Sequence, residues 1–244
     1  MGETTRTRSC PFTVERPIMR HRWDQLTFLH WSFQPEDVQR LLPRGLVVDT
    51  YDRAAWVGLV PFLMEVRSKR GNALDWPFRF PETNVRTYVR DSEGEAGVWF
   101  FSLDSTRWGA VPVARSSYRV PYFWSEMSFA RSGNRMTYEL RRRWPNPRGV
   151  RSEVSVEIGE SYRDDELTEF DHYLTARWIV YGSWGGSILK AYAEHEPWPL
   201  HRSTAIYTDG LVEAAGLPTP EGSAVLHWSP GVDVLIGRPR RVRP

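Results

Sequence analysis

The sequence has few cysteines and few lysines. Cys10 is its only cysteine, which excludes an intrachain disulfide and a cysteine-based metal cluster, and its position near the N-terminus argues against a catalytic role. Of the 32 basic residues only Lys69 and Lys190 are lysines. Because arginine stays protonated and is not an amine nucleophile, Schiff-base chemistry has two candidate residues in the whole chain.

Long apolar runs and extended basic tracts are also missing. No apolar segment approaches the roughly 18 residues needed to span a bilayer, and the first ten residues are polar, unlike a secretory signal. The formal net charge is +2, and acidic residues are interleaved with the arginines except at Arg141–Arg143 and near the C-terminus. We therefore expect a cytoplasmic protein that binds neither membrane nor nucleic acid.

The common catalytic motifs are absent as well. The chain contains no glycine-rich phosphate loop, no G-x-S-x-G and no H-E-x-x-H. Its histidines include His30, His195, His201 and His227, but no spacing among them fixes a zinc site, and scattered histidines are more often structural. The sequence therefore predicts no metal and no cofactor.

What the sequence does contain is a series of short β-strand patterns joined by turn signals. About ten strands and three short helices are indicated, without regular alternation of strand and helix. This pattern favours a mainly β (α+β) fold, either an antiparallel barrel or a sandwich. With no linker in the sequence, we expect one domain over residues 23–244, preceded by a mobile segment, residues 1–22.

Some local expectations are specific. A short helix is expected over Asp164–Phe170, and Ser229-Pro230-Gly231 is expected to form a turn between two strands. Pro61 lies within a predicted strand and requires an edge, a bulge or a strand end there. The loop over residues 68–81 contains glycine and prolines among aromatic residues and is a candidate lid.

Residues 82–89 combine a polar and an apolar strand face. Strict alternation places Glu82, Asn84, Arg86 and Tyr88 on one face, and two valines and a threonine on the other. On the residues alone, the polar face is more typical of a solvated surface. Inside a barrel, the same side chains would have to pair with one another or with a ligand, and their pKa values would shift.

A series of motifs spans nearly the whole chain, from about Trp23 to Val242. In order they are FLHW at 28–31, LPRGL at 42–46, GLVPF at 58–62, ETNVRTYV at 82–89, Ala114-Arg115, Pro121-Tyr122, Phe170 with TARW at 175–178, His195 with PWPLH at 197–201, and SPGVDV at 229–234. This series resembles the YqjF-like family, which is grouped with the acetoacetate decarboxylase-like proteins. The resemblance implies a mainly antiparallel, cone-shaped β-barrel with a few short helices and an enclosed pocket.

The resemblance also bears on the chemistry. In the decarboxylases a glutamate on an early barrel strand faces the pocket, and a later Pro-Lys-Lys segment supplies the amine that forms a Schiff base with the keto acid. Glu82 matches that glutamate. The later segment here is Pro121-Tyr122-Phe123, so both lysines are missing and decarboxylation through a Schiff base is not expected.

The pocket that the resemblance implies is lined by Glu82, Asn84, Arg86, Arg115, Tyr118 and Tyr122. Arg86 and Arg115 suit a carboxylate or another anion, although Arg86 paired with Glu82 would be a structural alternative. One functional hypothesis is binding of a small anionic or oxygenated molecule without a Schiff base.

Two other functional hypotheses stay open. A lyase, isomerase or hydrolase without a covalent intermediate would use Glu82 as general acid or base, with Tyr118 or Tyr122 as proton donor. A structural barrel filled by its own side chains would instead form homo-oligomers through its tryptophan-rich loops.

Overall fold

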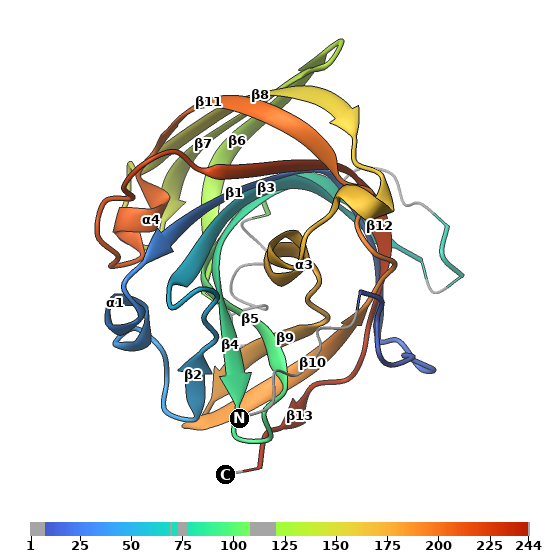
Figure 1. Ribbon diagram of the computed structural model, residues 1–244, viewed down its shortest axis with the longest axis vertical. Helices are drawn as coiled ribbons and strands as arrows, with labels where there is room; N and C mark the ends of the chain where they lie inside the picture. Colours follow the sequence, from blue (N-terminus) through green and yellow to red (C-terminus); the bar gives the residue numbers. More distant parts are fainter. Residues whose placement is uncertain (1–7, 69, 73–77, 108–120, 244) are drawn as a thin grey trace.

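The computed structural model describes residues 8–68, 70–72, 78–107 and 121–243, and these form one sheet of thirteen strands (Figure 1). The strands are β1 (Met19–Phe33), β2 (Leu46–Val48), β3 (Ala55–Arg67), β4 (Arg79–Asp91), β5 (Ala96–Ser105), β6 (Tyr122–Ser132), β7 (Arg135–Trp144), β8 (Arg151–Ser161), β9 (Ile179–Trp184), β10 (Ser187–Glu194), β11 (His201–Asp209), β12 (Val225–Ile236) and β13 (Arg240–Arg241). The helical segments are α1 (Pro35–Gln39), the 3-10 turn η1 (Asp164–Glu166), α3 (Glu169–Thr175) and α4 (Leu211–Ala214). None of these described helices is long and apolar enough to cross a membrane.

The sheet closes on itself twice. The two rings have strands β12, β1, β3, β4 and β5 in common, and these form the shared wall. Pairing of β4 with β5 closes a nine-strand barrel of β1, β3, β4, β5, β6, β7, β8, β11 and β12. Pairing of β10 with β12 and of β5 with β9 closes a second ring of seven strands, β12, β1, β3, β4, β5, β9 and β10. Figure 1 shows α3 inside this seven-strand ring. The predicted mainly antiparallel β-barrel with few helices is therefore confirmed, with β5 running parallel to β6 and β9.

The shared wall has a packed interior on each side. On β3, Val57 and Leu59 pack into the core of the nine-strand barrel together with residues of β7 and β8. The alternate residues Val60 and Phe62 pack into a separate cluster on the side of the seven-strand ring. Because neither side of the wall faces water, β4 is buried on both faces, from residue 82 to residue 89.

Two prolines lie inside strands of this wall, where β1 is irregular. The register of β1 with β3 shifts between Asp24 and Leu29, and Gln25 has a positive φ of 53°. Pro61 of β3 and Pro230 of β12 lie beside this break. Their missing N–H groups therefore fall where the hydrogen-bond ladder is already interrupted, and the bulge is the option that Pro61 takes.

The turn expected at Ser229-Pro230-Gly231 is wrong, because β12 runs through these residues without a break. Proline followed by glycine is typical of a turn. Here the irregularity in the neighbouring strand β1 accommodates the proline. Gly231 has a φ of 115°, and a Cβ at this position would lie 2.1 Å from the backbone oxygen of Trp23. The glycine therefore allows two strands to approach closely, and it does not reverse the chain.

The single helix expected over Asp164–Phe170 is also wrong in its bounds. The chain forms η1, an extended segment at Leu167 and Thr168, and then α3. The Thr168 hydroxyl accepts the N–H of Asp171, and the Asp171 carboxylate accepts the N–H of Thr168. This capping box starts a separate helix at Glu169.

A buried ion pair joins β5 to β7 across β6. Arg142 donates from Nε to Oδ1 of Asp104 at 2.8 Å and from Nη2 to Oδ2 at 2.6 Å. The two side chains are 1% and 0% exposed. Ser125 donates a further hydrogen bond to Asp104, and the guanidinium lies 3.7 Å from the centre of the Phe123 ring. Two parallel bonds satisfy the desolvated charges.

We expect Arg142→Met to lower the free energy of unfolding by about 3 to 5 kcal/mol, because it leaves the Asp104 carboxylate buried without its cation. Arg143→Ala is the matched control, since Arg143 pairs with Glu126, which is 58% exposed, and such pairs contribute about 1 kcal/mol or less. Urea denaturation measures both. Equal losses in the two variants would contradict this account of the ion pair.

Candidate functional site

The polar residues of β4 face the interior of the seven-strand ring. Glu82, Asn84, Arg86 and Tyr88 are 2%, 5%, 8% and 0% exposed. Arg86 Nη2 and Tyr88 Oη both donate to the backbone oxygen of Leu174 in α3, at 3.3 Å and 2.5 Å. The polar strand face is therefore buried. The residues alone had favoured a solvated surface.

Glu82 pairs with Tyr122, the first residue of β6. Tyr122 Oη donates to Glu82 Oε2 at 3.0 Å. Burial raises the pKa of Glu82 from 4.5 to about 8, against the lowering effect of the Tyr122 hydrogen bond, and the charge of Asp104 raises it further. Glu82 is thus mainly a neutral carboxylic acid at pH 7. Among the described residues Glu82 forms no ion pair with Arg86, whose Nη2 instead donates to the Leu174 carbonyl.

Tyr88 connects β4 to β1 and α3. Its Oη lies 2.6 Å from His30 Nε2 and 2.5 Å from the backbone oxygen of Leu174. A carbonyl oxygen only accepts, so the tyrosine proton points at Leu174, and His30 Nε2 carries the proton donated to the Tyr88 oxygen. Burial lowers the pKa of His30 well below its usual value, and the charges of Arg86 and His227 add to this. The His30 ring is therefore neutral.

Gly58 of β3 makes room for this arrangement, because it lies between His30 on β1 and Arg86 on β4 in the sheet register. A Cβ at Gly58 would come within 2.8 Å of Cδ2 and Nε2 of His30 and 3.6 Å from Cγ of Arg86. A glycine is therefore needed where the imidazole lies against the strand.

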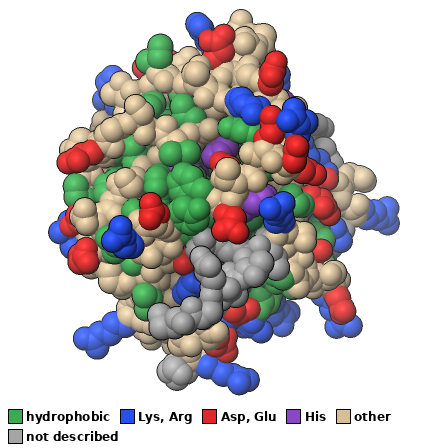
Figure 2. Space-filling model, in the orientation of Figure 1, with side chains coloured by type: hydrophobic (Ala, Val, Ile, Leu, Met, Phe, Trp, Pro, Cys, Tyr) green, Lys and Arg blue, Asp and Glu red, His purple; other side chains and the backbone are tan. Residues whose placement is uncertain are grey.

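A second buried histidine faces the ring from β12. His227 Nε2 lies 2.8 Å from Oδ1 of Asp171 in α3. Burial acts to raise the pKa of Asp171, but hydrogen bonds from His227 and Thr168 outweigh it and lower the pKa. The ionised carboxylate accepts, so His227 Nε2 donates. In the space-filling view, the visible histidine side chains lie near the position of α3 (Figure 2).

Four of these side chains each have a buried polar atom without a hydrogen-bond partner. The atoms are Nδ1 of His30, Oδ1 of Asn84, Nε of Arg86 and Nδ1 of His227. Their positions adjoin: Arg86 and His30 flank Gly58, Asn84 precedes Arg86 by two residues, and His227 is diagonal to His30 on the β1–β12 pair. Native proteins leave few buried polar groups unpaired, so these atoms mark the candidate site.

Lys190 is bound elsewhere and is not a free amine. Its Nζ donates to Asp91 at 2.6 Å and also to Glu93 and Glu95. Burial acts to lower the pKa of Lys190, but the hydrogen bonds to these carboxylates outweigh it and raise the pKa above its usual value. The other lysine, Lys69, lies outside the described residues.

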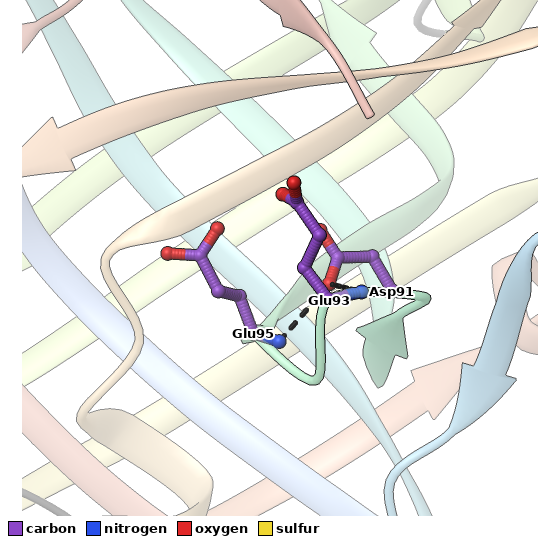
Figure 3. Close-up of side chains that lie close together, drawn as sticks. All are labelled: Asp91, Glu93 and Glu95. Atoms are coloured by element: carbon purple, nitrogen blue, oxygen red, sulfur yellow. Dashed lines mark hydrogen bonds between the residues drawn. The ribbon is translucent and has the colours of Figure 1, made fainter. Parts of the chain in front are cut away.

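The three carboxylates that hold Lys190 lie at the β4–β5 hairpin, where the N–H groups of Glu93 and Glu95 both donate to Asp91 (Figure 3). Their ligand atoms lie within 4.8 Å of one another, close enough for a metal ion. The lysine ammonium already contacts all three. The cation that these three carboxylates bind is therefore the Lys190 ammonium.

Two predicted site residues, Arg115 and Tyr118, lie outside the described residues, as do residues 69 and 73–77 of the candidate lid. The structure brings Glu82 and Tyr122 into contact and places Asn84 and Arg86 on the same inner face. Sequence reasoning assigned His30 and His227 no role beyond structure. For His30 the sequence did contain a signal. His30 and Phe28 are two residues apart in the FLHW motif, so they share one face of a predicted strand.

Comparison with solved structures shows the fold. MppR, an enduracididine biosynthesis enzyme complexed with pyruvate, matches with a TM-score of 0.65 and 16% identity, over 96% of this chain and 92% of that chain. The acetoacetate decarboxylase of Legionella pneumophila matches with a TM-score of 0.64 and 12% identity, over 96% and 93%. An acetoacetate decarboxylase-like enzyme from Sphingomonas wittichii RW1 matches with a TM-score of 0.63 and 10% identity, over 96% of each chain.

Comparison of sequences shows the family. The chain is 30% identical over 221 residues to the Bacillus subtilis (strain 168) protein named "Uncharacterized protein YqjF". The aligned region covers 90% of each protein. The model of the DUF2071 family, described as an uncharacterized conserved protein, matches residues 20–233. The chain therefore belongs to the DUF2071 family, with YqjF as a relative and an acetoacetate decarboxylase-like fold.

Proposed function

We propose that this protein binds a small anionic or oxygenated organic molecule inside the seven-strand ring, without forming a Schiff base. The observation that carries the proposal is the pair of unpartnered atoms on the inner face of β4, Oδ1 of Asn84 and Nε of Arg86. A buried polar group without a partner costs about 1 to 3 kcal/mol. A ligand that supplies the complementary group recovers this cost on binding.

The charge of Arg86 favours an anionic ligand. Its guanidinium lies 5.3 Å from the centre of the Phe28 ring and donates a hydrogen bond to the Leu174 carbonyl. Glu82 on the same face is mainly neutral at pH 7 and pairs with Tyr122. No carboxylate forms an ion pair with Arg86 in the described part of the chain, so a ligand carboxylate is the natural partner for its free Nε.

The comparisons fit a small carboxylate. MppR, which has this fold, was solved in complex with pyruvate, although a likeness at 16% identity carries the fold alone. In this chain the segment Pro121-Tyr122-Phe123 contains no lysine, and Lys190 is protonated and held by three carboxylates. Noncovalent binding is therefore the form of recognition that these residues support.

A second candidate function is acid–base catalysis by Glu82. A group with a pKa of about 8 exchanges its proton near neutral pH, as a general acid or base must. Tyr122 lies in hydrogen-bond contact with it and offers a second proton donor. A lyase, an isomerase or a hydrolase without a covalent intermediate fits this pair. Turnover that survived Glu82→Gln unchanged would rule this candidate out.

We expect pyruvate or another small carboxylate to raise the melting temperature of the native protein, and Arg86→Gln to weaken binding roughly 10- to 100-fold, the effect of one charged hydrogen bond. Arg90→Gln is the control on the same strand, since Arg90 is half-buried and pairs with Asp49. Thermal shift against ligand concentration measures both. Equal binding by native protein and Arg86→Gln, or a covalent borohydride adduct at a lysine, would contradict the proposal.

We expect Glu82 to make stability fall as pH rises. The unfolded carboxyl ionises near pH 4.5 and the folded one near pH 8, so the folded state holds the extra proton between these values. The contribution of Glu82 is complete below pH 4.5 and lost by pH 8, roughly 3 to 5 kcal/mol in all.

Glu82→Gln should therefore gain stability relative to the native protein as pH rises from 5 to 8, measured by urea denaturation. Glu153→Gln, at an exposed position on β8, is the control and should follow the native curve. Parallel curves for the native protein and Glu82→Gln would show that the carboxyl ionises normally.

A further inference from the structure

We infer that the proposed binding site selects a hydroxy acid over the corresponding oxo acid, with His30 as the residue that accepts the ligand's hydroxyl hydrogen bond. This inference rests on the proposed anion site at Arg86 and names the chemical class that fits beside it. Arg86 and His30 lie on either side of Gly58 in the sheet, and Cγ of Arg86 and the Cδ2–Nε2 edge of His30 both lie within 4 Å of the position that a Cβ on that glycine would take. The two side chains therefore adjoin on the inner face of the ring.

The first step is the proton position on His30. Tyr88 has a single hydroxyl proton, and its 2.5 Å contact with the Leu174 carbonyl uses it. The 2.6 Å contact between Tyr88 Oη and His30 Nε2 then requires the proton on Nε2. Since the buried ring is neutral, Nδ1 carries no proton and is a hydrogen-bond acceptor only.

The second step is the direction of Nδ1. The ring edge formed by Cδ2 and Nε2 is the part of His30 that lies against Gly58. Nδ1 is across the ring from that edge, so it faces away from β3. The contacts with Tyr88 and Gly58 hold the ring in this orientation. His30 is 0% exposed, and its Nδ1 has no hydrogen-bond partner.

The third step is a count of what the neighbouring unpaired atoms require. Asn84 Oδ1 is an acceptor by chemistry. Together with His30 Nδ1, two acceptors lie beside one donor, Arg86 Nε. A ligand that satisfies this set needs a carboxylate for the arginine and a donor group for the acceptors.

A hydroxyl meets this need better than an oxo group or an ammonium. An oxo oxygen has no proton and would place its lone pairs against those of the imidazole, whereas a hydroxyl donates. An ammonium also donates, but it would be desolvated near the Arg86 cation, and the nearby Glu82 is mainly neutral at pH 7. Sites built to bond a hydroxyl discriminate strongly against analogues that lack one.

The test compares matched ligands, lactate with pyruvate and 2-hydroxyglutarate with 2-oxoglutarate, by titration calorimetry. We expect the hydroxy acid of at least one pair to bind roughly 10- to 100-fold more tightly. In Tyr88→Phe, Nε2 of His30 loses its acceptor, so the ring is free to carry its proton on Nδ1. Discrimination should then fall towards equality, while Arg86 still binds the carboxylate.

The outcomes separate this inference from the function on which it rests. Oxo acids that bind as tightly as hydroxy acids, with both lost in Arg86→Gln, would overturn the inference and leave the anion site in place. If neither hydroxy acids nor oxo acids bound the native protein any better than they bind Arg86→Gln, the inference and the proposed function would both be overturned.

A second measurement needs no ligand. A long-range ¹H–¹⁵N correlation spectrum distinguishes the two histidine tautomers, and His30→Gln identifies the signals of His30 by their loss. We expect the Nε2-protonated form in the native protein and an increase in the Nδ1-protonated form in Tyr88→Phe. A native His30 protonated on Nδ1 would overturn the inference.

Discussion

A strand that borders two enclosed interiors has no side in contact with water, so every polar side chain on it needs a partner within the protein or in a ligand. In this structure β4 is such a strand, because it belongs to the nine-strand barrel and to the seven-strand ring at once. Its carboxyl, amide, guanidinium and phenol groups are all nearly inaccessible. The raised pKa of Glu82 and the unpaired atoms of Asn84 and Arg86 both follow from this placement.

The rest of the site is built around the same constraint. Helix α3 lies inside the ring (Figure 1), where its Leu174 carbonyl accepts hydrogen bonds from Arg86 and Tyr88. Tyr88 in turn fixes the proton of His30. On the opposite face of the wall, the Asp104–Arg142 pair satisfies its charges internally and is closed to a ligand. The two faces therefore differ in their charges: Asp104 and Arg142 neutralise each other, whereas Arg86 has no carboxylate partner among the described residues.

The sequence predicted the fold class and the family from motifs spread along nearly the whole chain, and the alternation over residues 82–89 predicted which side chains share a face. The alternation alone did not show that this face is enclosed, because a solvated strand and a strand facing a polar interior have the same pattern; the enclosed pocket came only from the family resemblance. The turn at residues 229–231 was wrong because the bulge that accommodates Pro230 lies in β1, some 200 residues away in the chain.

The contact between Glu82 and Tyr122 depends on the parallel register of β5 with β6, and the roles of His30 and His227 depend on α3 lying inside the ring. Neither arrangement has a local signal in the sequence. The central claim is that this polar face is desolvated, and the ¹³C chemical shift of the Glu82 carboxyl, followed by NMR as a function of pH, tests it most directly. Titration with a midpoint near pH 8 is the predicted result. A midpoint near 4.5, the value of an ordinary solvated glutamate, would contradict the account.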